Sequence, residues 1–221
     1  MKKTILLLLA LNAWGVFAQS PLRLGVHADP LASWLSPKSS DIEKDGTRPG
    51  FSWGLIMEYY FHPNYGIVSG LSMTMLGGNI LYNVPVNITM GSSGSQTDVS
   101  LDAGTTVAFH PNYLSLPLAI KLKTNEIGYF TYYAQMGLRH YINIGARATA
   151  TGSGLAKDNV SKEINMLNMS YFFGGGVEYN IGGNTSLTAG IFYDNGFIDV
   201  LSNNDHKAVS NFITFRIGVL F

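Results

Sequence analysis

Five histidines are the residues of this chain that could act as general bases: His27, His62, His110, His140 and His206. A nucleophilic triad needs a serine, a histidine and a carboxylate that meet in space. The histidines are scattered, and the sequence identifies no serine and acid that would complete a triad. His140 is the candidate for a base that acts on lipid. It alternates in step with apolar residues that we expect to face lipid, and it lies near the end of its predicted strand. We predict no catalytic residue and keep a lipid-modifying enzyme as an alternative.

Asp41, Glu43 and Asp45 alternate in a polar stretch and could bind a hard cation such as calcium. The acidic residue that closes an EF-hand loop is missing, so we interpret the stretch as a solvated acidic loop. The chain has no cysteine, which excludes disulfides, thiolate metal sites and a cysteine nucleophile. We therefore expect no metal and no cofactor.

The sequence Phe-His-Pro-Asn-Tyr occurs twice, at 61–65 and at 109–113. Proline and asparagine set turn conformations, and this chemistry explains each copy alone. We expect the first copy in a short turn and the second just after a long loop, on opposite sides of a membrane. The repeat therefore does not predict a shared site.

Strict alternation of side chains is the main structural signal. It is clearest in 113–123, where every second residue is leucine or isoleucine and the residues between them are mostly small or polar. Alternation with a period of two is typical of a β-strand with two different faces. The same test identifies eight segments: 22–29, 51–61, 67–75, 113–123, 130–139, 169–179, 186–194 and 213–221.

The connections between these segments alternate in length. Those near 62–65, 125–128 and 182–184 are tight, whereas 36–48, 82–109, 145–165 and 197–208 are long and rich in Gly, Ser, Asn and Asp. An even number of strands, with short turns at one end and long loops at the other, is typical of an outer-membrane barrel. We predict an all-β, eight-stranded, antiparallel up-and-down transmembrane β-barrel with short periplasmic turns and long exterior loops.

The composition indicates which face meets lipid. Only 13% of the residues are charged, whereas a soluble domain carries about 25%. A lipocalin-like barrel would have its apolar side chains inside and its charges in water. Here the polar face carries too few charges to cover a water-exposed exterior, so we interpret the bulky apolar face as the outside.

The polar face then lines the lumen. An eight-stranded barrel is just wide enough for side chains to fill it, so we predict paired charges and no aqueous pore. Arg23 and Glu58 should lie on neighbouring strands, and this pair is our first expectation. A narrow channel through these residues is the alternative. The predicted lumen network consists of Arg23, His27, Asp29, Glu58, Lys121, Lys123, Arg139, Glu178, Asp194 and Arg216.

The first residues have the pattern of a secretory signal peptide. Lys2 and Lys3 precede an apolar run that is too short to span a bilayer, and small residues follow up to Ala18. We predict a signal peptide over 1–18 and one barrel domain over 19–221, exported to the outer membrane. With 14 basic and 14 acidic residues, the chain carries no excess of positive charge for nucleic acid.

These features together resemble the PorT-like outer-membrane β-barrel proteins of Bacteroidota. The likeness covers the whole mature chain, and its most specific parts are the strand at 113–123, with Tyr113, Pro117 and Lys121, and the terminal FITFRIGVLF. That last strand, with Phe215, Ile217, Val219 and Phe221, looks like the signal read by the barrel-assembly machinery.

The resemblance implies location and fold, and it transfers no ligand. The family's namesake takes part in protein secretion through the type nine system. We expect a non-enzymatic scaffold that serves envelope integrity, surface interaction or secretion. Its expected partners are outer-membrane lipid, the barrel-assembly machinery, and a surface protein or glycan bound by the exterior loops.

Overall fold

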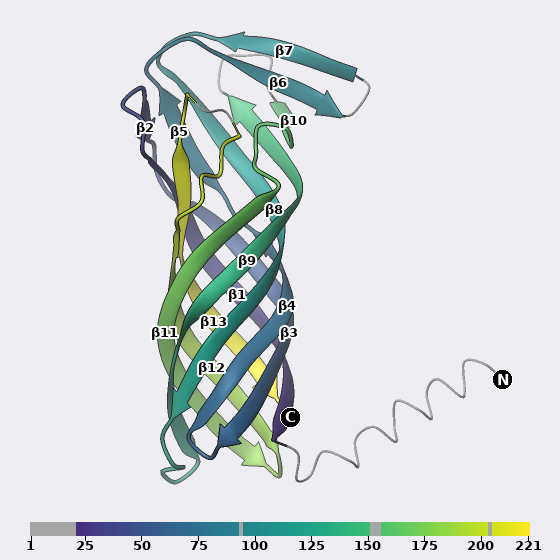
Figure 1. Cartoon of the computed structure of the whole chain (residues 1–221), viewed down its shortest axis with the longest axis vertical. Coiled ribbons are helices and arrows are strands. Elements are labelled where there is room, and N and C mark those ends of the chain that lie inside the picture. The colour runs from purple at the N-terminus through teal and green to yellow at the C-terminus, as the bar shows by residue number, and fades with distance from the viewer. Residues whose placement is uncertain (1–20, 93–94, 151–155, 203–204) are drawn as a thin grey trace, which may run out of the picture.

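The computed structural model describes residues 21–92, 95–150, 156–202 and 205–221. The predicted signal peptide over 1–18 lies outside these residues. Eight long strands form the body of the molecule (Figure 1). They are β1 (Leu22–Pro37), β3 (Arg48–His62), β4 (Tyr65–Met75), β8 (Thr105–Lys123), β9 (Phe130–Ala150), β11 (Leu167–Gly182), β12 (Thr185–Gly196) and β13 (Ala208–Leu220).

The eight strands close into a ring. Each pairs antiparallel with the next long strand along the chain, and β13 returns to pair with β1 through residues such as Val219 and Val26. This up-and-down order confirms the predicted fold class. No described residue belongs to a helix that is long and apolar enough to cross a membrane.

Tight turns gather at one end of the barrel. They join β3 to β4, β8 to β9 and β11 to β12, and the C-terminus lies at the same end (Figure 1). Gly128, Gly182 and Gly183 have positive φ angles of 68°, 122° and 61°. Side chains other than hydrogen are strained in this conformation, so these turns need glycine.

The opposite end is an extension built mostly of strands, where the sequence predicted long loops. It contains β2 (Ile42–Lys44), β5 (Gly78–Tyr82), the hairpin of β6 (Val86–Ser92) and β7 (Ser95–Leu101), and β10 (Ala156–Asn159) (Figure 1). β8 and β9 also continue into it, and they reach 19 and 21 residues. The long connections predicted at 82–109 and 145–165 are therefore present, and much of each forms strands that extend the barrel.

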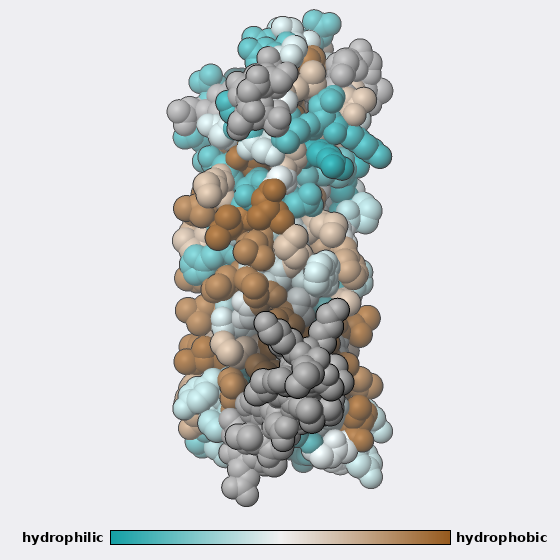
Figure 2. Space-filling model, turned by 90° about the vertical axis from the view of Figure 1, so that its right-hand side faces the viewer, coloured by the Kyte–Doolittle hydropathy of each residue, from teal (hydrophilic) through white to brown (hydrophobic). Residues whose placement is uncertain are grey.

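An apolar belt surrounds the half of the barrel that carries the tight turns. Figure 2 shows apolar residues gathered on this half and mostly hydrophilic residues over the extension. The belt side chains come from all eight strands and are exposed, among them Val26, Trp53, Leu71, Leu118, Met136, Phe173, Ile191 and Ile217. The expected outward orientation of the apolar face is confirmed for this half.

The polarity of the two faces reverses in the extension. On β1 the inward residues change from His27 and Asp29 to Leu31 and Leu35, all of them buried. A cluster of buried apolar side chains fills the extension and includes Ile80 and Phe109. The extension therefore has the apolar interior of a water-soluble barrel, and this interior caps the lumen below it.

The two copies of the Phe-His-Pro-Asn-Tyr repeat have different structures. The first forms the tight turn between β3 and β4, as expected. The second lies inside β8, with a register shift against β9 between Asn112 and Tyr113. The expectation of a turn-like join after a loop was wrong for the second copy, because β8 begins at Thr105, before the repeat.

The apolar belt generates a prediction for Leu118, which is 52% exposed on the outward face of β8. Leu118→Arg should lower the free energy of unfolding in lipid vesicles by about 2–4 kcal/mol, since a charge near the middle of the bilayer is poorly solvated. Urea titration followed by tryptophan fluorescence measures this. Thr106→Arg, on the same strand and face but in the extension, is the control. Equal stability of the two variants would contradict the assigned belt.

Candidate lumen network

Four charged side chains from four strands form the lower cluster, near the tight turns. The Lys121 ammonium donates to Glu58 Oε1 at 2.6 Å and also to Glu178. The Arg23 guanidinium donates to the other oxygen of Glu178 at 2.8 Å. The side chains of Glu58, Lys121 and Glu178 are at least 96% buried. Buried charges require such pairing, so the cluster neutralises itself.

Arg23 and Glu58, which were expected to pair, do not form an ion pair with each other. The two residues are direct cross-strand neighbours of β1 and β3, as the sequence indicated. Their ionic partners, however, lie across the lumen: Arg23 binds Glu178, and Glu58 binds Lys121 and accepts a hydrogen bond from the Tyr60 hydroxyl at 2.8 Å. The lumen is narrow enough for long side chains to reach past their neighbours.

The upper cluster lies nearer the extension. Asp29 Oδ2 is 3.3 Å from the Arg216 Nε donor and 2.8 Å from His27 Nδ1. Asp194 Oδ1 lies 3.4 Å from Arg139 Nη1 and accepts a hydrogen bond from the Ser170 hydroxyl at 3.2 Å. The two guanidinium groups also lie over aromatic rings, Arg139 over Phe172 at 4.7 Å and Arg216 over Phe192 at 4.6 Å.

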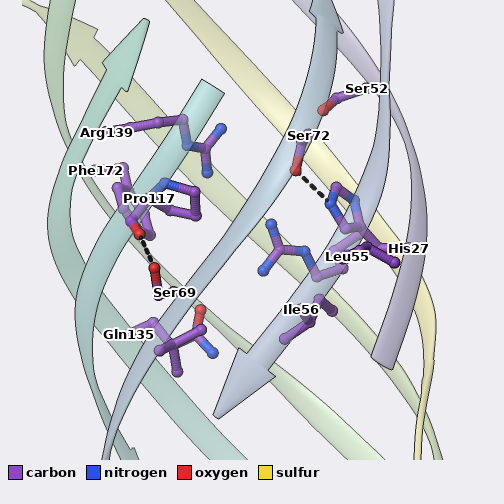
Figure 3. Close-up of a pocket in the computed structure, with 12 residues that line it drawn as sticks. His27, Ser52, Leu55, Ile56, Ser69, Ser72, Pro117, Gln135, Arg139 and Phe172 are labelled. Carbon is purple, nitrogen blue, oxygen red and sulfur yellow. Dashed lines mark hydrogen bonds between the residues drawn. The ribbon is translucent and has the colours of Figure 1, made fainter. Parts of the chain in front are cut away.

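Asp29, His27 and Ser72 have the order of a nucleophilic triad. His27 Nδ1 faces Asp29, and His27 Nε2 lies 2.8 Å from the Ser72 hydroxyl oxygen (Figure 3). The order of the three groups is that of the orienting acid, base and nucleophile of a hydrolase, although the His27 Nδ1 contact with Asp29 lacks hydrogen-bond geometry. Alternation along single strands does not reveal this arrangement, because Ser72 comes from β4 and reaches His27 only across β3.

The space beside this triad is too small for a substrate. The cavity that His27, Ser72, Gln135, Arg139 and Arg216 help to line has a volume of about 10 Å³, which is the size that holds one water molecule. Figure 3 shows these side chains in the space between the barrel strands. An ester or amide substrate does not fit in this cavity.

All ten residues of the predicted lumen network lie on the inward face of the barrel or at its lower opening. Nine of them form the ion pairs above, and Lys123 instead lies over the Tyr60 ring at 3.9 Å. Uncharged members were overlooked, although their parity is the same. They are Tyr60, Ser72, Tyr133, Tyr141, Ser170, Ser186 and Thr188.

The other candidate residues do not converge. His140 is exposed on the outward face, with Leu116 and Met169 as its cross-strand neighbours. Glu43 accepts from Asn83 and Asp45 accepts from Thr106, so the acidic stretch serves two separate contacts. Within the described residues no three potential ligands are grouped to hold a metal ion.

A family model described as outer membrane protein beta-barrel domain matches residues 17–215. No curated protein matches the chain. Among solved structures, Neisserial surface protein A is 16% identical, with a TM-score of 0.49 over 91% of this chain and 96% of that one. The attachment invasion locus protein Ail of Yersinia pestis is 15% identical, with a TM-score of 0.41 over 90% and 98%. OprG from Pseudomonas aeruginosa is 11% identical, with a TM-score of 0.46 over 90% and 94%. Likenesses at this level carry no information about ligands or activity.

The lower cluster generates a prediction for Lys121. Lys121→Met should lower the free energy of unfolding by about 3–5 kcal/mol, because it leaves two buried carboxylates with one cation. Adding Glu58→Gln should recover part of this loss, since it removes one of the unpaired charges. Urea unfolding in vesicles measures both effects.

The matched control is Lys207→Met, which changes the same residue type at an exposed position and should alter stability by less than about 0.5 kcal/mol. If Lys121→Met unfolded at the same urea concentration as the unmodified protein, the ion pairs would contribute nothing to closure.

Proposed function

Because the chain belongs to the outer membrane protein beta-barrel family, we propose that it is a non-enzymatic scaffold that holds its strand-built extension outside the cell for surface interaction. The observation that carries this proposal is the reversal of polarity along the strands. An apolar belt suits lipid, and an extension with its own apolar core suits water. A barrel with no task outside the membrane has no need for such a cored extension.

The proposed mechanism has three parts, each performed by a different set of side chains. The belt fixes the barrel in the outer membrane. The buried ion pairs of the lower and upper clusters hold strands of the wall together. The extension then presents β2, β7 and the upper ends of β8 and β9 on a rigid support. Binding elements on rigid supports lose less conformational entropy when a partner binds.

An enzymatic role has weaker support. The triad of Asp29, His27 and Ser72 is enclosed, and its neighbouring cavity admits nothing larger than water. His140, the alternative lipid-directed base, faces lipid among apolar side chains. The geometry therefore favours a structural use of both histidines.

A channel is also less well supported. Any path along the lumen would have to pass Lys121 between two carboxylates and then the apolar cluster that contains Ile80, Val107 and Phe109. The last three are at most 1% exposed. Ions cross such a dry apolar region at high cost, which favours a closed barrel.

The proposal also covers the subfamily, the assembly signal and the partner of this protein. The likeness of 113–123 and of the last strand supports a PorT-like protein with a role in secretion or envelope integrity. Phe215, Ile217, Val219 and Phe221 alternate on one face of the C-terminal segment, which suits recognition by the barrel-assembly machinery. A surface protein or a glycan is the proposed partner of the extension.

The orientation is testable because the chain has no cysteine. Asp98→Cys on β7 should react with a membrane-impermeant maleimide in intact cells, and Asn184→Cys in the turn between β11 and β12 should react only after permeabilisation. Both positions are exposed, so accessibility alone decides the result. Labelling of Asn184→Cys alone in intact cells would invert the proposed orientation.

Excision of the hairpin tests the scaffold role. Replacing Val86–Leu101 with Gly-Asn-Gly should leave a barrel that still shifts on heating in gel electrophoresis, because the hairpin pairs with no barrel strand. Binding to a glycan array or to intact cells of the same species should fall at least about tenfold, the loss of about 1.4 kcal/mol of contact energy. Undiminished binding, or no binding by the unmodified protein, would contradict surface interaction through the hairpin.

A further inference from the structure

An open groove of about 480 Å³ lies on the outer surface where the apolar belt ends. It forms because β4 stops at Met75 and the chain resumes as β5 only at Gly78. Met75 is paired with Phe51 on one side and Asn112 on the other, so the groove crosses three strands. Its lower part is continuous with the lipid-facing belt, since Phe51 and Met75 are 40% and 44% exposed.

The upper part of the groove is basic. His110 and Arg147 are direct cross-strand partners on β8 and β9, and both line the groove together with Lys157 of β10. Behind them, Arg48 Nη1 donates to His110 Nε2 at 2.9 Å, and Arg48 Nε donates to Asn79 at 2.5 Å. Two permanent positive charges therefore line the groove, and a third lies behind His110.

The electrostatics of His110 agree with this concentration of charge. Its pKa is lowered by burial and by the positive charges of Arg48 and Lys157. No carboxylate is among the residues that line the groove. Asp158, which follows Lys157, instead accepts a hydrogen bond from the Ala156 backbone amide at 2.8 Å. The groove thus carries positive charge without an acidic partner in its lining.

The backbone holds Lys157 at this place in an unfavourable conformation. Its φ angle is 61°, and it is the one described residue other than glycine with a positive φ. This left-handed conformation is uncommon for lysine and is kept only where surrounding contacts impose it. Here the Lys157 amide donates to Thr149 Oγ1 on β9 at 3.2 Å, which ties it to the strand that carries Arg147.

We propose that this groove binds the phosphate-bearing headgroup of a lipid in the surrounding leaflet. Arg147 and Lys157 supply charge-assisted hydrogen bonds to phosphate oxygens, which are among the strongest such bonds in proteins. Arg48 adds positive charge from behind His110. Phe51 and Met75 contact the first part of an acyl chain. The occupant is a membrane lipid rather than free phosphate, because the basic part and the lipid-facing part form one continuous surface.

This inference requires the barrel to span a membrane but does not require a surface partner. Its failure would leave the scaffold role untouched, and the failure of the scaffold role would leave the groove able to bind lipid. Basic pockets at the edge of a bilayer recognise anionic headgroups by the same chemistry.

The test measures binding of diphosphoryl lipid A to the detergent-folded chain by microscale thermophoresis. Arg147→Gln with Lys157→Gln should weaken binding at least about tenfold, because it removes two charged hydrogen-bond donors. Lys162→Gln with Lys207→Gln removes the same number of charges at exposed positions outside the groove and should change affinity less than about twofold. Gel mobility before and after heating checks that each variant is folded.

Two further arms distinguish a lipid from a free anion. Inorganic phosphate at millimolar concentration should not displace lipid A, and Phe51→Ser with Met75→Ser should weaken lipid binding while leaving the gel shift intact. Equal affinity of the two charge variants would overturn the proposed groove. Displacement by phosphate, or unchanged binding after removal of Phe51 and Met75, would reassign it to a free anion and overturn the lipid proposal.

Discussion

Closure of the hydrogen-bonded ring is the constraint on which the rest of the structure depends. In lipid, an unpaired backbone amide or carbonyl has no water to bind, so a sheet can cross a bilayer only without open edges. Here the pairing of β13 with β1 removes the last edge. Once the ring is closed, every strand has one face toward lipid and one toward a narrow lumen, and the choice of side chains on each face follows from that division.

The narrow lumen explains why its charges form compact clusters instead of a solvated path. A charge without a counter-charge inside such a barrel would cost several kcal/mol, and the chain meets this with Lys121 between Glu58 and Glu178, and with Asp29 between His27 and Arg216. All of these contacts except that of His27 with Asp29, which lie on the same strand, join different strands of the wall. The same geometry that resembles a hydrolase triad at Ser72 is therefore a consequence of dense pairing, because short hydrogen-bonded chains of polar groups are what a nearly dry lumen selects.

The sequence predicted the barrel well because alternation along the belt is strong on every strand, as in 113–123. It predicted the extension poorly, since the apolar parity there moves to the inward face: Val107 and Phe109 are buried, while Thr106 and His110 lie on the other face. Because the sequence prediction relied on apolar residues along the outward face, such stretches were interpreted as long loops. The ionic partners of Arg23 and Glu58 could not be predicted from the sequence either. Strand register identifies only the nearest cross-strand residue, whereas a long side chain can form its ion pair with a residue on a more distant strand. Ser72 was missed for a related reason: its histidine is two strands away, and the two side chains meet over Gly54 of β3, which has no side chain between them.

The reversal of polarity also explains why chemistry on the outer surface gathers at the top of the belt. Below it, an outward charge would face hydrocarbon, and above it, an outward charge is solvated by water on all sides. At the transition, β4 ends, β8 and β9 shift register beside Asn112, and the basic residues His110 and Arg147 follow on adjacent strands. A register shift bends the strands and changes where their side chains point, and this one lies beside the groove left between the end of β4 and the start of β5. The end of β4 and the register shift together accompany an apolar floor beside a basic rim, a combination that neither half of the barrel provides alone.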